Sequence, residues 1–520
     1  MKIKPIAILA LALLALFPQG LTGEIYTTGA AEIAGALGLS VDEGTWFKTL
    51  NMFGQLTALP LAAWLAYRVG YRALFRLGAI IGLISAVISS LWMSPAAQMT
   101  AWFGHGVSAS FLLLFAHAIV LKNLNYREIA LVESVMLLSA VLIPLSIYPY
   151  ILAHLAEDNL WHWAFAIQVA PFLMMLFFAR FGQWPVPEQP EKINFNWIQA
   201  FLLSGFICAV TFLLLRGERY NWFREPMIIE LTVLTLLLGV TAFVALRFKW
   251  GRGEYIRTAA LSEPHGKVGM LDAAVAGFVI LGSTMLISSY VTQVMQYNHA
   301  QLGELEMIGF AGMIGGLVIA LIATSNPKLD PEKVIPVGVS IMVIACVLLA
   351  RSNAQSGVSD LWLPLLLKGL AIGILNITLT IHILRSFPKR YVVEGIAWFF
   401  LFRNLGSMLA ITEFSRLMSI ETASAMSILA ENFNASSDIF IGQQQLVIQV
   451  LQQSGHGSAA ESSVILLMGQ LKTQALSIAG INNFQWLIFS IVMLVPVMAI
   501  AMKWATNHPH SQNHNATNEI

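Results

Sequence analysis

Charged side chains are scarce in this sequence. Asp, Glu, Lys and Arg make up only 11% of 520 residues, and the formal net charge at pH 7 is +1. A soluble globular domain carries roughly 25% charged residues, so this composition argues against a soluble protein. The near-zero net charge gives no reason to expect a nucleic-acid partner. Cysteine is limited to Cys208 and Cys346, both within apolar runs, so we expect no disulfide framework.

Motifs that carry catalysis are missing as well. We find no glycine-rich phosphate-binding loop, no metal-ligand spacing and no credible nucleophile–base arrangement. These absences argue against an ATP-driven pump, a metal site and an enzyme, and we expect no cofactor. Any transport must then be driven by an ion gradient or by the gradient of the substrate itself.

Long apolar runs fill the chain instead, and hydrophobic residues make up 57% of it. A helix that crosses a membrane needs about 20 mainly apolar residues. We predict fourteen such spans, at residues 5–31, 45–66, 72–93, 97–120, 129–153, 160–181, 196–215, 228–248, 269–293, 303–324, 334–351, 361–384, 394–418 and 484–503. The first run imitates a signal peptide, but it continues past Pro18 and Gly20 through Ala34, which favours a retained helix. The predicted class is an all-α, multi-pass membrane protein.

The positions of Lys and Arg predict the orientation of these spans. If the N-terminus is cytoplasmic, 20 of the 29 basic residues fall in cytoplasmic segments, 6 fall in external segments and 3 lie within spans. Basic loops are retained on the cytoplasmic side. We therefore expect both termini in the cytoplasm.

Three breaks in the pattern divide the chain. A proline-rich stretch follows the sixth span, a basic stretch follows the eighth, and a Gln-, Ser- and Ala-rich external segment separates the last two spans. Two six-helix bundles around an axis along the membrane normal would give a 6+2+6 arrangement. The predicted units are a first bundle at 1–181, a linker with two inserted helices at 182–268, a second bundle at 269–503 with an external loop at 419–483, and a disordered cytoplasmic tail at 504–520.

Short motifs at matching places along the chain carry a family resemblance. They are Phe17-Pro-Gln-Gly-Leu-Thr-Gly-Glu-Ile in the first span, Gly44-Thr-Trp46, Trp64-Leu-Ala-Tyr-Arg68-Val-Gly70-Tyr-Arg72, Trp161-His-Trp163, Arg216-Gly-Glu-Arg-Tyr-Asn-Trp222, Lys368-Gly-Leu-Ala-Ile-Gly373 and Phe402-Arg403-Asn-Leu-Gly-Ser407. In this order the chain resembles the fourteen-helix drug:proton antiporters of the major facilitator superfamily, of the EmrB/QacA type. The resemblance implies the major facilitator fold and alternating access. It also implies that Arg68, Gly70 and Arg72 form a cytoplasmic hinge motif. In this chain Tyr67 replaces the acidic residue that the motif usually contains.

The first half departs from this family pattern. Where the family has an acidic residue in its first helix, this chain has Thr22, and Glu24 follows two residues later. Where the family has an arginine in its fourth helix, this chain has Trp102. The glycine-rich motif of the fifth helix is reduced to Pro144 and Pro149 among bulky residues. These departures leave proton coupling and the direction of transport open.

Ionisable residues within spans are costly and usually functional. Glu24, beside Thr22, is our candidate for proton coupling or gating, and the alternative is a structural glutamate near the outer interface. For the substrate cavity we predict Gln19, Tyr26, Lys368, Asn376, Thr380 and Arg403. Arg403 could equally be a structural clamp between helices. Glu413 and Arg416, three residues apart, could satisfy each other.

Together these patterns predict a secondary transporter of the bacterial inner membrane that exports amphipathic organic compounds in exchange for protons. Its expected partners are small amphipathic substrates, protons and membrane lipids, and the resemblance adds a periplasmic adaptor and an outer-membrane channel. Two alternatives remain: a carrier of a siderophore or another specific metabolite, and a membrane receptor or scaffold that does not transport.

Overall fold

The structure is a computed structural model of the chain. It describes residues 5–28, 30–139, 143, 147–148, 151, 155, 160–181, 193–262, 264–325, 333–353, 355–385, 387, 391–431, 438–453 and 459–507. Within these ranges, the side chains at 24, 26–28, 30–32, 41, 126–127, 262, 299–300, 325, 382, 384–385, 438–439 and 506 lie outside the description. Pro144, Pro149 and residues 508–520 of the predicted tail also lie outside the described residues.

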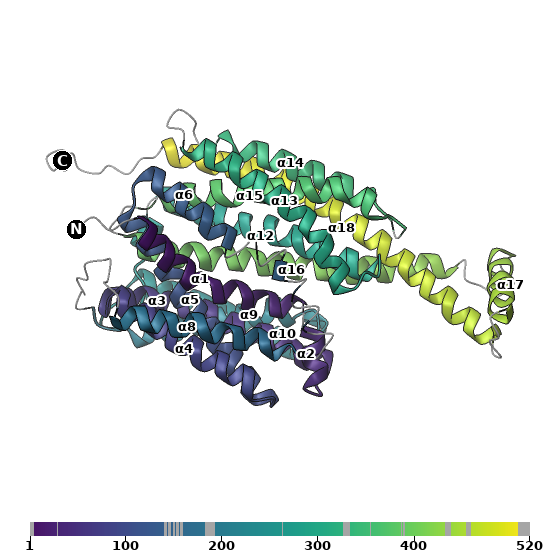
Figure 1. Cartoon of the computed structure of the whole chain (residues 1–520), viewed down its shortest axis with the longest axis horizontal. Helices are drawn as coiled ribbons and strands as arrows, with labels where there is room; N and C mark the ends of the chain where they lie inside the picture. The colour runs from purple at the N-terminus through teal and green to yellow at the C-terminus, as the bar shows by residue number, and fades with distance from the viewer. Residues whose placement is uncertain are drawn as a thin grey trace.

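The described elements are helices (Figure 1). They are α1 (Pro5–Thr28), α2 (Ala30–Ala36), α3 (Val41–Arg68), α4 (Tyr71–Leu91), α5 (Pro95–Asn123), α6 (Tyr126–Leu137), α8 (His162–Phe181), α9 (Trp197–Arg216), η2 (Trp222–Arg224), α10 (Pro226–Arg247), α11 (Ala259–Ser262), α12 (Pro264–Gln293), α13 (His299–Ser325), α14 (Ile335–Leu349), α15 (Val358–Arg385), α16 (Val392–Glu431), α17 (Asp438–Gln453) and α18 (Ala459–Asn507). The start of α1 and the end of α18 lie at the same end of the helix bundle, which we call the terminal side. α17 lies beyond the other end, the arm side (Figure 1).

Each of the fourteen predicted spans overlaps one of these helices. Eleven helices in the described part of the chain are long and apolar enough to cross a membrane, and the shorter Ile335–Leu349 is also apolar. Two predicted spans account for most of the difference. The span at 129–153 is described as a helix only to Leu137, and α3 carries polar residues such as Lys48, Asn51 and Gln55 along its length. The count of fourteen crossings therefore stays a prediction.

The helices pack in two groups with a pair between them. The first group is α1, α3, α4, α5 and α8, and the second is α12, α13, α14, α15, α16 and α18. The described part of α6 contacts both groups, through α1 and α5 of the first and α13 and α15 of the second. The paired helices α9 and α10 contact α3 of the first group and α16 of the second through α9. This grouping has the predicted order, while the exact domain boundaries stay a prediction.

Glycine allows the closest helix crossings in both groups. A Cβ at Gly54 or Gly106 would collide with the backbone of the partner helix in the α3–α5 crossing. Gly312 and Gly373 occupy equivalent contacts in the α13–α15 crossing. Helices in a membrane associate mainly through close van der Waals packing, which small residues permit. The two crossings fix the helices that flank the interior of the molecule.

The loop after α9 ties the inserted pair to both groups. Arg216 is 1% exposed, and its Nη2 lies 3.1 Å from Oδ1 of Asp42 at the start of α3. On the other side, Arg416 of α16 lies 3.7 Å from Glu218. The sequence suggested Glu413 as the partner of Arg416. The ion pair found in the structure joins Arg416 to Glu218 instead, because the loop after α9 brings the Glu218 carboxylate close to the guanidinium.

Two helices continue past the bundle on the arm side. We expected an external loop at 419–483, and the described part of this segment is helical. α16 runs unbroken to Glu431, α17 covers Asp438–Gln453, and α18 runs from Ala459 to Asn507. At 1.5 Å per residue, the 49 residues of α18 span roughly 74 Å. The arm formed by the ends of α16 and α18 with α17 projects from the bundle (Figure 1). The low hydropathy of residues 419–483 therefore reflects that they lie outside the bundle. It does not indicate where the helices α16 and α18 end.

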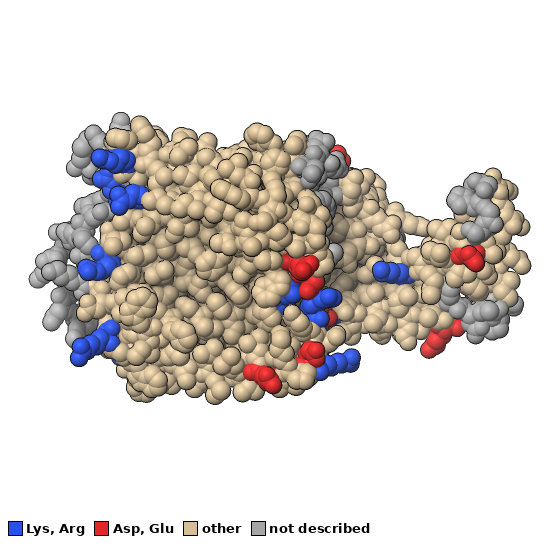
Figure 2. Space-filling view, turned by 90° about the horizontal axis from the view of Figure 1, so that it is seen from below, with Lys and Arg blue, Asp and Glu red and all other residues tan. Residues whose placement is uncertain are grey.

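Surface charge is unevenly placed between the two ends. On the face in Figure 2, the charged side chains at the terminal side are Lys and Arg, whereas toward the arm side acidic side chains appear together with Lys and Arg. The positive-inside rule associates such a basic end with the cytoplasm.

Candidate functional site

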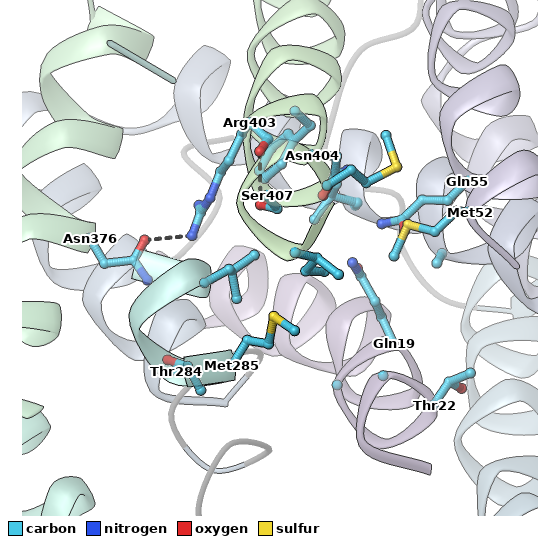
Figure 3. Close-up of a pocket in the computed structure, with 18 of the residues that line it drawn as sticks. Gln19, Thr22, Met52, Gln55, Thr284, Met285, Asn376, Arg403, Asn404 and Ser407 are labelled. Atoms are coloured by element: carbon cyan, nitrogen blue, oxygen red, sulfur yellow. Dashed lines mark hydrogen bonds between the residues drawn. The ribbon is translucent and has the colours of Figure 1, made fainter. Parts of the chain in front are cut away.

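A cavity of about 670 Å³ lies between the two helix groups. Its walls come from α1, α3 and α5 of the first group, from α12, α13, α15 and α16 of the second, and from α6, with Leu215 added by α9. Figure 3 shows labelled side chains from both groups pointing toward the same space. The lining extends toward the arm side, where it reaches Lys48 and the exposed Gln293.

The cavity wall mixes apolar and polar side chains. Met52, Met285 and Phe400 offer adaptable apolar surface. Several buried polar atoms on the wall have no hydrogen-bond partner in the described part of the structure: Gln19 Oε1, Glu306 Oε2, Asn376 Nδ2 and Asn404 Nδ2. Buried polar groups are almost always satisfied, and exceptions call for an explanation such as a ligand. The wall therefore offers both acceptors and donors to an amphipathic molecule.

Arg403 and Asn376 form the polar contact between α16 and α15. Arg403 Nη2 donates to Asn376 Oδ1 over 2.9 Å (Figure 3). Ser407, one turn along α16, donates to the carbonyl of Arg403 over 2.9 Å. Arg403, Asn376 and the nearby Thr380 all line the cavity, so these three predicted cavity residues lie together. The guanidinium can both bridge two helices and face a substrate.

Lys368 lies behind the cavity wall. It is 1% exposed, and its Nζ is 3.4 Å from Oε1 of Glu306 on α13. Glu306, unlike Lys368, lines the cavity. The sequence reasoning overlooked Glu306, although an acid within the apolar run 303–324 was a signal for it.

The wall formed by α1 is partly described. Thr22 is buried and lines the cavity, and its hydroxyl lies 2.9 Å from the Pro18 carbonyl and 3.0 Å from Gln168 Oε1. Gln19 lines the cavity one turn earlier. Glu24 and Tyr26 belong to α1, but their side chains lie outside the described residues. Their proposed roles stay predictions.

A second acid–base pair, His117 and Glu133, lies on the opposite wall. Nε2 of His117 on α5 lies 3.5 Å from Oε2 of Glu133 on α6, and both side chains are nearly buried and line the cavity. Neither residue is among the site residues that the sequence predicts. The two residues lie sixteen positions apart on different helices, and nothing in the sequence pairs them.

A contact joins the two groups at the terminal side of the bundle. The hydroxyl of Tyr67 at the end of α3 donates to Glu394 Oε2 at the start of α16 over 2.5 Å. Arg257, from the segment that joins the two groups, lies 3.8 Å from the other oxygen of Glu394 and 4.8 Å above the Tyr67 ring. Tyr67 thus supplies a contact between the groups at the position where the resembling family has an acid.

The predicted hinge residues lie beside this contact. Gly70 has a φ of +86° between α3 and α4, a conformation that favours glycine. Arg72 Nε donates to the Ala179 carbonyl over 2.7 Å, which ties α4 to α8 within the first group, and Arg68 is exposed. The structure thus gives Gly70 and Arg72 local structural contacts, and the hinge role stays a prediction. No group of three or more metal-ligating side chains occurs within the described residues.

Comparisons with known proteins agree with this architecture. The family model described as "Major Facilitator Superfamily" matches residues 12–411. The chain is 25% identical over 492 residues to the multidrug export protein EmrB of Haemophilus influenzae, with 92% of each chain covered. It is 23% identical over 393 residues to the multidrug export protein EmrB of Escherichia coli K12, with 74% of each chain covered. Among solved structures, the proton:xylose symporter XylE matches with a TM-score of 0.55 at 13% identity, over 79% of this chain and 88% of that chain.

Proposed function

The chain belongs to the major facilitator superfamily, and from this premise we propose that it is a proton-coupled exporter of amphipathic organic compounds. The observation that carries the proposal is the cavity of about 670 Å³ whose wall is shared by both helix groups. A site between two six-helix units is where transporters of this architecture bind substrate. The names of the curated relatives, which are multidrug export proteins, support export of drug-like compounds.

The chemistry of the wall supports an amphipathic substrate. Methionine and phenylalanine side chains accept apolar groups of varied shape. The unpaired Glu306 oxygen and the Gln19 carbonyl would accept hydrogen bonds from a cationic or donor group. Arg403 would bind a carbonyl or an anionic group. A small-molecule site usually has a mainly apolar wall with a few polar groups that orient the ligand.

Alternating access would follow from closing one side at a time. The Tyr67–Glu394 contact would hold the terminal side shut while the lining extends to the arm side. With the terminal side in the cytoplasm of a bacterial inner membrane, this conformer would receive protons and release substrate externally. In this proposal Glu24 on α1 carries a coupling proton. The arm would then lie in the periplasm, where it could bind an adaptor protein that leads to an outer-membrane channel.

The proposal is tested in everted membrane vesicles with ethidium, an amphipathic cation, and a pH-sensitive dye. We expect ethidium to cause proton release from energised vesicles that contain the wild-type protein. Glu24→Gln should abolish that release, and the exposed Glu304→Gln on α13 should leave it unchanged.

Each other outcome points to a different function. Unchanged release in Glu24→Gln would remove Glu24 from coupling. Flux with an anionic catecholate but not with ethidium would favour a siderophore or other metabolite carrier. Absence of flux with either compound would favour a receptor or scaffold.

A further inference from the structure

The segment that follows α10 runs along the terminal side and is held to both helix groups. We call its residues 248–258 the strap; it ends where α11 begins. The hydroxyl of Tyr255 donates to the Thr57 carbonyl of α3 over 3.2 Å. On the other side, Nε1 of Trp398 on α16 donates to the Arg257 carbonyl over 3.2 Å. The strap therefore contacts the first group and the second within three of its own residues.

Ion pairs connect the surface of the strap to the contact between the groups. Nζ of Lys249, whose side chain is 73% exposed, lies 3.1 Å from Oε1 of Glu254. The other oxygen of Glu254 accepts a hydrogen bond from Nε of Arg257 over 3.2 Å. Nη1 of Arg257 lies 3.8 Å from Oε1 of Glu394, whose other oxygen accepts from Tyr67. Opposite charges thus alternate from the exposed Lys249 to the Tyr67–Glu394 contact.

A change of partner at Lys249 should reach the far end of this chain of ion pairs. Glu254 is shared between two cations, so its hold on Arg257 strengthens when Lys249 turns to another anion. The distance of 3.8 Å between Arg257 and Glu394 is longer than a hydrogen bond, so this link is the easiest to lose. An anion bound at Lys249 should therefore weaken the hold of Arg257 on Glu394.

The surface around Lys249 has the composition of a lipid headgroup site. Arg247 and Arg252 flank Lys249 in the sequence, are exposed and form no ion pair with a described residue. Phe248 is 69% exposed and Trp250 is 47% exposed. Tryptophan is enriched where a membrane protein meets the headgroups of the bilayer. Basic residues beside the cytoplasmic end of a spanning helix attract anionic lipids.

The backbone at the end of α10 is consistent with a role for the Lys249 side chain. Lys249 has a φ of +51°, and the N–H of Trp250 bonds back to the Ala245 carbonyl over 2.9 Å. Glycine is the usual residue in this left-handed position after a helix, because a side chain there adds strain. Residues that hold such a conformation often lie at functional sites.

We propose that the strap binds the headgroup of an anionic phospholipid through Arg247, Lys249 and Arg252. The bound phosphate draws Lys249 away from Glu254, Arg257 moves toward Glu254, and the contact between the groups opens more readily. The exposed aromatic rings beside these residues favour a lipid over free phosphate, because a lipid also offers apolar groups to them. Lipid binding stands by itself, whereas its effect on opening rests on the proposed alternating access.

The first experiment counts bound lipid. Full-length protein is reconstituted in nanodiscs of phosphatidylcholine and phosphatidylglycerol in equal parts and extracted in mild detergent, and the retained phosphatidylglycerol is counted by native mass spectrometry. Arg247→Gln with Arg252→Gln should retain one phosphatidylglycerol molecule fewer than the wild type. Arg224→Gln with Arg351→Gln, a control pair of exposed arginines outside the strap, should retain as many as the wild type.

The second experiment follows the opening of the terminal side. Spin labels are attached at Val69→Cys, after α3, and at Ile500→Cys, near the end of α18, in a background with Cys208→Ala and Cys346→Ala. Both labelled positions are exposed, and they belong to different groups. Double electron–electron resonance should show that phosphatidylglycerol at least doubles the share of the longer distance relative to phosphatidylcholine alone. Inorganic phosphate added to phosphatidylcholine nanodiscs should change nothing.

Substitutions in the same labelled protein test the chain of ion pairs. Lys249→Gln should increase the share of the longer distance in phosphatidylcholine alone and remove the response to phosphatidylglycerol, because Glu254 is released from Lys249 in either case. Arg247→Gln with Arg252→Gln should keep the wild-type distances of phosphatidylcholine in both lipids. Glu394→Ala, which removes the contact itself, gives the reference for an open terminal side.

The outcomes distinguish this proposal from the transport function. Equal lipid counts in the wild type and the Arg247/Arg252 variant, or an equal response to free phosphate, would overturn the lipid site. A bound lipid that leaves the distances unchanged, while Glu394→Ala lengthens them, would overturn the effect on opening and leave the transport function standing. If Glu394→Ala does not lengthen the distance, the proposed alternating access fails together with that effect, and the lipid count still decides whether the site exists.

Discussion

The α3–α5 and α13–α15 crossings are built alike and filled differently. Both depend on glycines whose Cβ would strike the partner backbone. In α3–α5, Trp102 packs with its centroid 4.6 Å from Phe47 and 5.9 Å from Phe165. In α13–α15, the buried space holds the Glu306–Lys368 ion pair instead. One backbone geometry thus accepts an aromatic cluster or a pair of opposite charges, provided that every charge has its partner.

Breaking the ion pair should have the largest effect on stability. Lys368→Ala leaves the Glu306 carboxylate buried without its counter-ion. Removing one partner of a buried pair typically costs about 3–5 kcal/mol. We expect a loss of this size in the free energy of unfolding, measured by denaturant titration in mild detergent.

A double variant provides the control for this prediction. Lys368→Met with Glu306→Leu replaces both charges by apolar groups, and should recover most of the lost stability because neither charge is left unpaired. A double variant as unstable as Lys368→Ala would show that Lys368 stabilises the crossing by packing alone.

Adding a methyl group at the crossings tests whether they are equally tight. Gly106→Ala would place its Cβ against the backbone of Asn51, and Gly373→Ala against that of Met313. Overpacking of this kind costs about 1–3 kcal/mol, and we expect similar losses at both sites in the same unfolding measurement. Gly469→Ala in the arm, where nothing lies within 4 Å of the added Cβ, should cause no loss. A loss at only one crossing would mean that the two are not equivalent.

The sequence predicted the helices and part of the cavity for a clear physical reason. A polar side chain in an apolar run avoids lipid, so Gln19, Thr22, Asn376, Thr380 and Arg403 could be expected to face the interior, where all five line the cavity. Their roles in binding and coupling stay predictions.

The pairings were beyond reach of the sequence because they join distant segments. Glu306 and Lys368 are separated by 62 positions, and Tyr67 and Glu394 by 327. Lys368 was predicted to face the substrate, yet its ammonium is directed to an acid that only the packing of α13 on α15 supplies. The continuity of the arm with the bundle was out of reach for another reason: hydropathy detects burial in lipid, whereas α18 continues as a helix outside the bundle.

The smallest expected difference concerns how α3 and α13 begin. Both start with a capping box, in which side chain and backbone exchange hydrogen bonds: Ser40 with Glu43 in α3, and Asn298 with Gln301 in α13. The hydrogen bonds from the Ser40 backbone and hydroxyl lower the pKa of Glu43. A lowered folded-state pKa stabilises the helix start above the unfolded-state pKa, and this contribution is lost as the pH falls through the folded value.

Gln301 does not titrate, so the start of α13 should not respond to acid. We expect hydrogen exchange at the Ser40 amide, corrected for the intrinsic rate, to lose protection as the pH falls below about 4.3, the ordinary glutamate pKa. The Asn298 amide should keep its protection over the same range. Glu43→Gln should remove the pH dependence at Ser40 and make the two helix starts behave alike. Equal pH dependence at both amides would instead indicate that acid opens the arm side as a whole, not the cap of α3.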